Sequence, residues 1–424
     1  MKIHLDTIGC RLNQAEIEQM ARQFRAEGHT LVAEPAGADL VVVNTCAVTT
    51  EAAADSRQKI RQAARAGARE IIVTGCWSSL QPTQAAELPG VRRIIPNERK
   101  DHLVTEVLGL PAERFDLEPL AREILPGLRQ RTRAFIKVQD GCDNACTFCV
   151  TTIARGAGRS RPIAEVLTDI RAALTGGAQE VVLTGVHLGS WGHDFGESLT
   201  TLIRAILADT DAPRLRLSSL EPWDLDAGFF SLWENPRLLP HLHLPLQSGS
   251  AAVLKRMRRK TTPQSFRQLA MAARAAIAQV AITTDVIVGF PGETEAEFGE
   301  TLDFVRELEF AGGHVFSYSS RPGTPAARMK NHLPGEVKKN RSAELRALFS
   351  ELNQTYRQQF LGQTLPVLWE STSELDEWGW QMEGLTGNYI RVSAHASSPR
   401  WNVVNQVKLT ALTPDGLRGE IIEP

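Results

Sequence analysis

The sequence predicts a mixed α/β protein with three parts: an N-terminal parallel α/β domain, an open barrel of six β/α units, and a small all-β module. The chain has 424 residues, which exceeds the usual size of a single hydrophobic core. Short β-branched runs alternate with helix-period segments over two separate stretches, and the pattern changes to short alternating runs near the C-terminus. We therefore expect domains at residues 1–120, 128–361 and 362–424.

The first stretch has the pattern of a Rossmann-like domain. Strands are predicted at residues 2–7, 39–45 and 70–74, and helices at about 14–27 and 51–66. Strands that alternate with helices in this way indicate a parallel sheet. The periodicity is interrupted at Pro111, Pro119 and Pro126, where we expect the domain to end.

The second stretch repeats the alternation six times. Strands are predicted near residues 134–138, 180–184, 214–218, 241–246, 283–288 and 314–318, and a long helix at about 335–360. Because a closed β/α barrel has eight such units, six predict a partial barrel that is open on one side.

The last stretch predicts the all-β module. Strands are expected near residues 365–370, 388–392 and 406–412. From Gln363 onward the sequence holds four Lys or Arg residues against eight Asp or Glu residues. An acidic module of this kind is a weak phosphate-binding surface on its own, although Tyr389 or Trp401 could stack on bases or simply belong to the core.

Composition indicates an ordinary globular protein, with 42% hydrophobic and 23% charged residues. No apolar run reaches membrane-spanning length and no secretory signal is visible, so a cytoplasmic protein without membrane contact is expected. The net charge of -2 argues against nucleic-acid binding by bulk charge. Local basic clusters, which are either solvated faces or RNA contacts, occur within residues 255–260, with five cations, and at Arg129, Arg131, Arg133, Lys137, Arg155, Arg159 and Arg161.

Three of the six cysteines, Cys142, Cys146 and Cys149, follow the first predicted barrel strand on one glycine-flanked loop. Three thiolates at this spacing can hold three corners of an iron–sulfur cubane and leave one iron free. A closed zinc site would need a fourth ligand, and no His or Cys lies between Cys149 and His187. The loop also falls at the carboxyl end of a barrel strand, where active sites of such barrels lie.

The other three cysteines, Cys10, Cys46 and Cys76, each close a predicted strand of the first domain. Parallel strands bring such ends to one edge of the sheet, so the three thiols are expected to converge. A buried free cysteine is common, but three at equivalent positions favour a second cluster.

These residues resemble the radical S-adenosylmethionine methylthiotransferase family over essentially the whole chain. The spacing of Cys142, Cys146 and Cys149 is typical of the radical superfamily. The set of Cys10, Cys46 and Cys76 indicates this narrower family. Further stretches resemble its signatures: LTGVH at 183–187, LSSLEP at 217–222, HLHLPLQSGS at 241–250, DVIVGFPGE at 285–293 and YSSRPGTP at 318–325. The stretch EGLTGNY at 383–389 resembles the RNA-holding TRAM module of these enzymes.

The resemblance implies two 4Fe-4S clusters, one on each cysteine set, and S-adenosylmethionine bound at the open iron of the cluster on Cys142, Cys146 and Cys149. A 5′-deoxyadenosyl radical would then abstract hydrogen from the adenine ring, while the cluster on Cys10, Cys46 and Cys76 would present methylated sulfur. Strand-end residues are candidates for holding the cofactor: Thr184, Gly185, Ser219, Glu221, Gln247, Gly289 and Gly292.

Within the family, TIGCRLNQ at 7–14 and TGVHLG at 184–189 look most like the branch that acts on threonylcarbamoyladenosine beside the anticodon of tRNA. The segment Trp77 to Ser79 departs from the Tyr-Ala-Gln-like stretch expected after the third cysteine. Implied partners are tRNA and an electron donor such as flavodoxin or ferredoxin, with the sulfur source open and a monomer expected. The alternatives are methylthiolation of isopentenyladenosine or of a ribosomal-protein aspartate, different radical chemistry such as plain methylation, and a zinc-stabilised RNA-binding protein.

Overall fold

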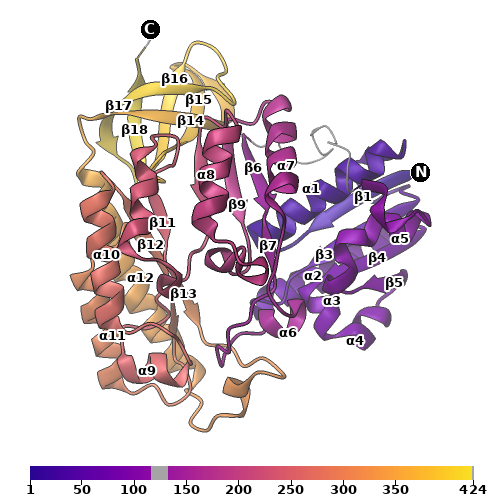
Figure 1. The fold of residues 1–424 in the computed structure, drawn as a ribbon, viewed down its shortest axis with the longest axis horizontal. Coiled ribbons are helices and arrows are strands. Elements are labelled where there is room, and N and C mark those ends of the chain that lie inside the picture. The colour runs from indigo at the N-terminus through magenta and orange to yellow at the C-terminus, as the bar shows by residue number, and fades with distance from the viewer. Residues whose placement is uncertain (116–131, 423–424) are drawn as a thin grey trace.

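The computed structural model describes residues 1–115 and 132–422. The predictions for Pro119, Pro126, Arg129 and Arg131 lie outside these residues. Figure 1 shows a parallel α/β domain at the N-terminal end, a larger β/α assembly beside it, and a β module at the C-terminal end.

The N-terminal domain is built on a parallel five-stranded sheet. Its strands run in the order β2 (Thr30–Val32), β1 (Lys2–Thr7), β3 (Leu40–Thr45), β4 (Glu70–Gly75) and β5 (Val91–Ile95). Its helices are α1 (Arg11–Ala26), α2 (Thr50–Arg65), α3 (Cys76–Leu80), α4 (Pro82–Ala86) and α5 (Leu103–Leu108). The three predicted strands and two predicted helices are confirmed, and β2 and β5 are additional.

Both faces of this sheet are covered, which explains the continuous apolar sequence of β3. Val42 packs in the cluster that contains Ile17 and Phe24 of α1. Val41 and Val43 pack in the cluster on the opposite face. Because side chains alternate along a strand, a central strand buried on both faces requires hydrophobic residues at every position.

The second region holds six parallel strands, in two three-stranded sheets. They are β6 (Arg133–Lys137), β9 (Glu180–Thr184) and β10 (Leu215–Leu217), followed by β11 (His241–His243), β12 (Ala281–Val288) and β13 (Gly312–Ser317). Isolated parallel bridges, such as that between Ser219 and His243, join the two sheets side by side. The predicted six-unit parallel arrangement, open between β6 and β13, is confirmed.

Helices cover the outer face of these strands. The principal ones are α7 (Ile163–Thr175), α8 (Leu199–Asp209), α10 (Pro263–Ala276), α11 (Glu295–Glu307) and α12 (Gly335–Gln358), with the short α6 (Thr151–Arg155) and α9 (Ala251–Arg256) near the strand ends. The main core lies between these helices and the strands. On the inner face, Ala15 of α1 contacts Phe135 and Val182, so the N-terminal domain packs against the interior side of β6 and β9.

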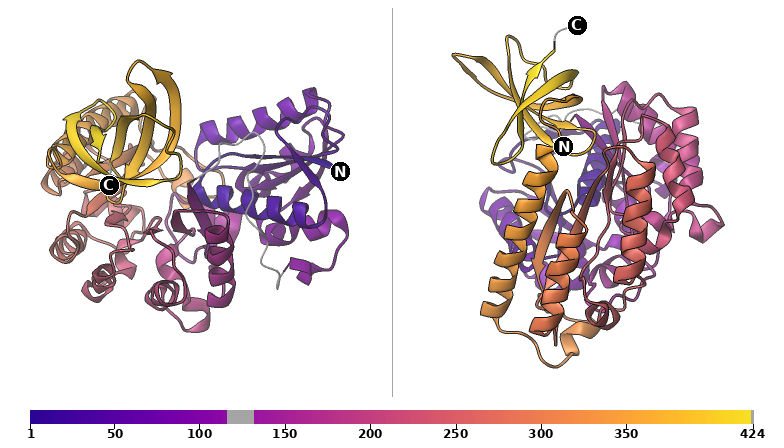
Figure 2. Two further views of the ribbon diagram at one scale, coloured as in Figure 1. Left: turned by 90° about the horizontal axis from the view of Figure 1, so that it is seen from above. Right: turned by 90° about the vertical axis from the view of Figure 1, so that its left-hand side faces the viewer.

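The C-terminal module is a closed β-barrel, which Figure 2 shows beyond the end of α12. Its strands are β14 (Thr364–Asp376), β15 (Gly379–Thr386), β16 (Arg391–Ala396), β17 (Val404–Leu412) and β18 (Leu417–Ile421). The predicted strand at 388–392 is wrong in position. Tyr389 has a φ of 67° in a turn, so the strand begins only at Arg391.

This module closes one end of the partial barrel. Tyr389 stacks on His241 with ring centroids 4.4 Å apart, and Arg216 Nη1 donates to the carbonyl oxygen of Gly387 at 2.9 Å. Arg11 of the N-terminal domain donates to the Tyr389 hydroxyl at 2.5 Å. One residue of the module therefore contacts both other parts of the chain. Among the described residues, no helix has the length and apolarity needed to cross a membrane.

Candidate active site

The loop with Cys142, Cys146 and Cys149 follows β6 and a short strand, β7 (Gln139–Asp140). Gly141 has a φ of 70°, and a Cβ there would lie 1.8 Å from the carbonyl oxygen of Ala157, so only glycine fits this tight turn. The three cysteines are free and partly exposed. The loop thus presents three thiols at the carboxyl end of the first barrel strand.

Polar groups approach two of these sulfur atoms. The backbone N–H of Asn144 lies 3.5 Å from Cys142 Sγ, and Arg259 Nη1 lies 3.7 Å from Cys146 Sγ. Burial lowers the pKa of His187, but hydrogen bonds to Asp224 and Cys142 outweigh it and raise that pKa to about 9. A hydrogen-bond donor or cation beside a sulfur atom stabilises the thiolate, which is the form that binds iron. Burial nevertheless raises the pKa of the Cys146 thiol, and Arg259 only partly offsets this effect.

Cys10, Cys46 and Cys76 lie at the carboxyl ends of three neighbouring strands, β1, β3 and β4. Burial raises the pKa of Cys46 to about 11, and the nearby thiols of Cys10 and Cys76 add to this shift. A Cβ on Gly9, which has a φ of 108°, would lie 2.6 Å from Cys46 Sγ. The three thiols therefore lie at one edge of the sheet, as predicted. Their role as cluster ligands stays a prediction.

Arg155, at the end of the helix α6 that follows Cys149, contacts the second cysteine set. Its Nε donates to Cys76 Sγ at 3.3 Å, and its Nη1 donates to Asp140 Oδ1 at 2.9 Å and to Glu16 Oε1 at 2.8 Å. The side chain is almost completely buried. The sequence analysis placed Arg155 among possible RNA-binding cations, and burial in this ion-pair network excludes that role.

The spacing of the thiols distinguishes a cluster from a zinc ion. Thiolates around a tetrahedral zinc ion lie about 3.8 Å apart. Within residues 1–115 and 132–422, three or more His, Cys, Asp or Glu ligand atoms come within 4.8 Å of one another only at His243, Asp285 and His314. Neither cysteine set has the close spacing of a zinc site in these ranges, and three thiolates on one loop or one sheet edge are the ligand type of an iron–sulfur cluster.

Three of the predicted cofactor-binding residues lie along the strand ends of the barrel. Thr184 Oγ1 donates to the carbonyl oxygen of Ile136 at 3.3 Å. A Cβ on Gly185 would lie 2.9 Å from Gln139 Oε1, so close packing alone explains that glycine. Gln247 has a φ of 70°, an unusual backbone conformation for a residue other than glycine and one that is enriched at binding sites.

The carboxylate of Glu221 binds both terminal nitrogens of Arg259, and Arg259 in turn contacts Cys146. Glu221 therefore positions the cation beside a predicted cluster ligand. Ser219 is half-buried and pairs with the backbone of His243.

Glu293 stabilises the turn with Gly289 and Gly292. Its Oε2 accepts hydrogen bonds from Gly289 N at 2.7 Å and from Arg341 Nη1 at 2.7 Å. Both glycines have positive φ angles, which the turn requires.

The structure adds polar groups that the sequence analysis missed. In the described part of the chain, Ser218 Oγ and Trp223 Nε1 are buried without a hydrogen-bond partner, close to the carboxyl end of β10. Buried polar atoms are nearly always paired, so unpaired ones at a strand end fit a site for a polar ligand. In the sequence, their position just after a predicted strand is the feature that could have indicated these two residues.

Most of the predicted RNA-contacting cations have internal partners. Lys137 contacts Asp101 and Asp140, Arg161 contacts Asp169, and Arg256 contacts Glu297. Exposed cations remain at Arg159, Lys255, Arg258 and Lys260. Tyr389 is occupied by its contacts with His241 and Arg11, and Trp401 is half-buried. Among the tryptophans of the module in the described ranges, Trp378 is the most exposed, at 72%.

Comparison with known families gives two matches. Residues 2–95 match the model described as "Uncharacterized protein family UPF0004", and residues 136–305 match the radical SAM superfamily. The first match covers the sheet with Cys10, Cys46 and Cys76, and the second covers the loop with Cys142, Cys146 and Cys149.

Several curated proteins are similar to the chain over its full length. Threonylcarbamoyladenosine tRNA methylthiotransferase MtaB of Thermotoga maritima is 35% identical, covering 99% of this chain and 98% of that protein. The Bacillus subtilis protein of the same name is 35% identical, covering 95% and 92%. The tRNA-2-methylthio-N(6)-dimethylallyladenosine synthase of Sphingopyxis alaskensis is 35% identical, covering 98% and 97%.

Among solved structures, the radical S-adenosylmethionine methyltransferase TsrM of Kitasatospora setae, with cobalamin and a [4Fe-4S] cluster bound, has a TM-score of 0.59 at 15% identity. The match covers 77% of each chain. At this identity the likeness concerns the fold alone.

Proposed function

The chain belongs to the radical S-adenosylmethionine tRNA methylthiotransferase family, and we propose that it adds a methylthio group to C2 of threonylcarbamoyladenosine next to the anticodon in tRNA. The full-length similarity to methylthiotransferases of two tRNA branches supports the reaction. The alternatives of a ribosomal-protein substrate and of a zinc-stabilised RNA-binding protein are not favoured.

The observation that carries this proposal is the contact of Arg155 with Cys76. Methylthiolation needs carbon activation and sulfur delivery at one place. Arg155 lies on the helix that directly follows the loop of Cys142, Cys146 and Cys149, and it bonds to a thiol of the other set. The helix that follows one cysteine set therefore contacts a thiol of the other set, an arrangement that suits a reaction using both.

We propose that Cys142, Cys146 and Cys149 hold one 4Fe-4S cluster and that Cys10, Cys46 and Cys76 hold the second. When bound, these groups supply the electron that cleaves S-adenosylmethionine and the sulfur that is transferred.

The residues of the chain orient the cofactor and exclude water. Ser218 and Trp223 offer unpaired polar atoms to S-adenosylmethionine at the barrel rim. Thr184, Gly185, Ser219, Gln247, Gly289 and Gly292 remain proposed contributors to that surface, and Glu221 is proposed to act through Arg259. The N-terminal domain covers the inner face of β6 and β9, which shields the radical chemistry from solvent.

Hydrophobic clusters support the proposed domains at 1–120, 128–361 and 362–424: one lies within the first range, one within the second, and one in the third that also includes Phe360 of the preceding segment. The closed β-barrel of residues 362–424 is proposed to be a TRAM module that contributes to tRNA binding. A monomeric cytoplasmic enzyme, reduced by flavodoxin or ferredoxin, completes the proposal.

The test is mass spectrometry of tRNA nucleosides from a strain that lacks this protein, compared with its parent. We expect methylthio-threonylcarbamoyladenosine to disappear and threonylcarbamoyladenosine to accumulate. Loss of the methylthio-isopentenyl nucleoside instead would assign the chain to the sister branch. Loss of neither nucleoside would refute a tRNA methylthiotransferase.

A further inference from the structure

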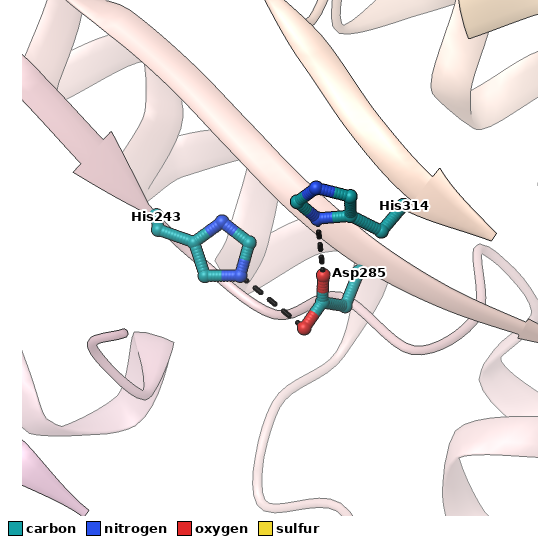
Figure 3. Close-up of side chains that lie close together, drawn as sticks. All are labelled: His243, Asp285 and His314. Carbon is teal, nitrogen blue, oxygen red and sulfur yellow. Dashed lines mark hydrogen bonds and ion pairs between the residues drawn. The ribbon is translucent and has the colours of Figure 1, made fainter. Parts of the chain in front are cut away.

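Three polar side chains from adjacent strands meet inside the partial barrel: His243 on β11, Asp285 on β12 and His314 on β13 (Figure 3). Asp285 Oδ2 lies 3.2 Å from His243 Nε2, and Asp285 Oδ1 lies 3.1 Å from His314 Nδ1. The strand register causes this meeting, because Asp285 pairs with His314 and Thr283 pairs with His243. One carboxylate therefore orients both imidazole rings.

The alternation along β12 shows which way this group faces. Ile282, Val286 and Val288 belong to the main core under the outer helices. Asp285 is on the opposite side of the strand, which is the interior of the barrel. Gln247 N donates to the carbonyl oxygen of Asp285 at 2.8 Å, so the group adjoins a turn proposed to contact S-adenosylmethionine.

The two histidines differ in what they can still bind. His243 also contacts Thr283 Oγ1 through Nδ1 at 3.0 Å, so both of its ring nitrogens are engaged. The His314 side chain is 72% exposed, and its Nε2 has no hydrogen-bond partner in the described ranges. The hydrogen bond to Asp285 raises the pKa of His314, while burial and Arg11 act in the opposite direction. His314 therefore offers an accessible ring nitrogen, and Asp285 favours its protonated form.

Arg11 is a second positive charge near His314. Arg11 follows Cys10 at the start of α1, and its positive charge is felt by both His314 and His241. The Arg11 guanidinium donates to the Tyr389 hydroxyl at 2.5 Å, and its charge together with the imidazole of His314 favours an anion in this region over a cation. They disfavour a divalent metal ion, and both Asp285 oxygens are already used by the two imidazoles.

We propose that His314, oriented by Asp285 and assisted by Arg11, binds the carboxylate of the threonylcarbamoyl group and thereby selects this adenosine over the dimethylallyl form. The inference rests on the proposed function and deepens it. A threonylcarbamoyl group ends in a carboxylate and a hydroxyl, whereas a dimethylallyl group is a hydrocarbon. The threonylcarbamoyl carboxylate would pair with the His314 donor, whereas a dimethylallyl group would leave that donor without a partner. Such a difference discriminates strongly between the two substrates.

The test uses the full-length reconstituted protein and three labelled anticodon stem-loop RNAs, which carry threonylcarbamoyladenosine, dimethylallyladenosine or unmodified adenosine. Dissociation constants are measured by fluorescence anisotropy for the parent protein and the His314→Gln variant. His29→Gln, at the distant edge of the N-terminal sheet, serves as the control. Cleavage of S-adenosylmethionine without RNA is measured in parallel.

We expect His314→Gln to weaken binding of the threonylcarbamoyl RNA by about 10- to 100-fold, the range for a hydrogen bond to a charged group. Binding of the other two RNAs and cofactor cleavage should not change, which a general structural defect would not reproduce. Asp285→Asn should weaken the same RNA selectively. His29→Gln should match the parent protein.

Unchanged affinity of His314→Gln for the threonylcarbamoyl RNA would overturn the inference while the proposed function stands, provided that the parent protein forms methylthio product on that RNA. If the parent protein forms no product, the proposed function fails instead. One zinc ion per chain that is lost in His314→Gln would identify a metal site and would also overturn the inference.

Discussion

Arg155 Nε donates a hydrogen bond to Cys76 Sγ at 3.3 Å, across 79 residues of sequence. The same guanidinium binds Glu16 and Asp140, so it connects helix α1, the loop after β6 and the sheet edge of the N-terminal domain. Because its donors form a planar fork in fixed directions, only arginine can satisfy these partners together. This side chain therefore links Cys76 to helix α1 and to Asp140, two residues before Cys142.

The first prediction concerns Arg155→Lys, which keeps the charge and loses the fork. The variant should be less stable by about 1–3 kcal/mol, the cost of leaving buried polar partners unpaired. It should also form less methylthio product per S-adenosylmethionine cleaved. Thermal unfolding and the ratio of product to 5′-deoxyadenosine measure the two effects. Arg306→Lys, on the exposed side of α11 and paired with Asp303, is the control. An unchanged ratio would remove Arg155 from the coupling of the two sites.

The second prediction separates the roles of the cysteine sets. Cys146→Ala should abolish cleavage of S-adenosylmethionine, because the first cluster would lose a ligand. Cys46→Ala should retain cleavage and form no methylthio product. Each variant, reconstituted anaerobically, should contain about four fewer irons per chain than the parent protein. Methylthio product from Cys46→Ala would exclude the second set from sulfur transfer, and cleavage by Cys146→Ala would exclude the radical assignment.

The regular elements were predictable where the hydrophobic pattern is strong. Val41 and Val43 belong to a strand buried on both faces, and the β-branched run alone identifies it. Strand β5 was missed because it lies at the sheet edge with Arg92 and Arg93 exposed, so its sequence lacks an apolar signature. The strand predicted at 388–392 failed because the positive φ of Tyr389 depends on tertiary contacts with another part of the chain.

The site was predictable only in part. The spacing of Cys142, Cys146 and Cys149 reveals a local ligand loop, since a single turn brings them together. The ion pair between Glu16 and Arg155 spans 139 residues, and no local pattern indicates it. RNA contact could not be predicted reliably for the basic run at 255–260 for the same reason. The sequence shows the charges, but the carboxylate that neutralises Arg259 comes from Glu221, 38 residues away.

The third prediction concerns acid stability. Glu180 is fully buried between Arg214 and Arg216, whose Nε atoms lie 3.0 and 2.6 Å from its carboxylate oxygens. Burial raises the pKa of Glu180, but the two guanidinium groups outweigh it and hold that pKa at about 2. Because this value is below that of the unfolded chain, the ionised group stabilises the fold above about pH 4.5, and the stabilisation is lost as the pH falls toward 2.

Glu180→Gln should therefore reduce the free energy of unfolding at pH 7 by roughly 3 kcal/mol, and it should weaken the dependence of that energy on pH between about 5 and 3. Urea unfolding of the cluster-free protein at a series of pH values measures both. Glu307→Gln, which removes an exposed ion pair with Arg267, is the control and should change little. A parallel pH dependence in Glu180→Gln and the parent protein would contradict the assignment.

The fourth prediction divides the basic run into two functions. Lys255 and Arg258 are exposed, whereas Arg259 is buried against Glu221 and contacts Cys146. The double variant Lys255→Gln, Arg258→Gln should weaken tRNA binding and reduce the slope of log affinity against log salt by about one for each lost phosphate contact. Arg259→Gln should leave this slope unchanged and slow S-adenosylmethionine cleavage, because the cation beside Cys146 is removed. Filter binding over a salt series and a cleavage assay distinguish the two. An unchanged salt slope in the double variant would assign the exposed cations to a solvated face without RNA contact.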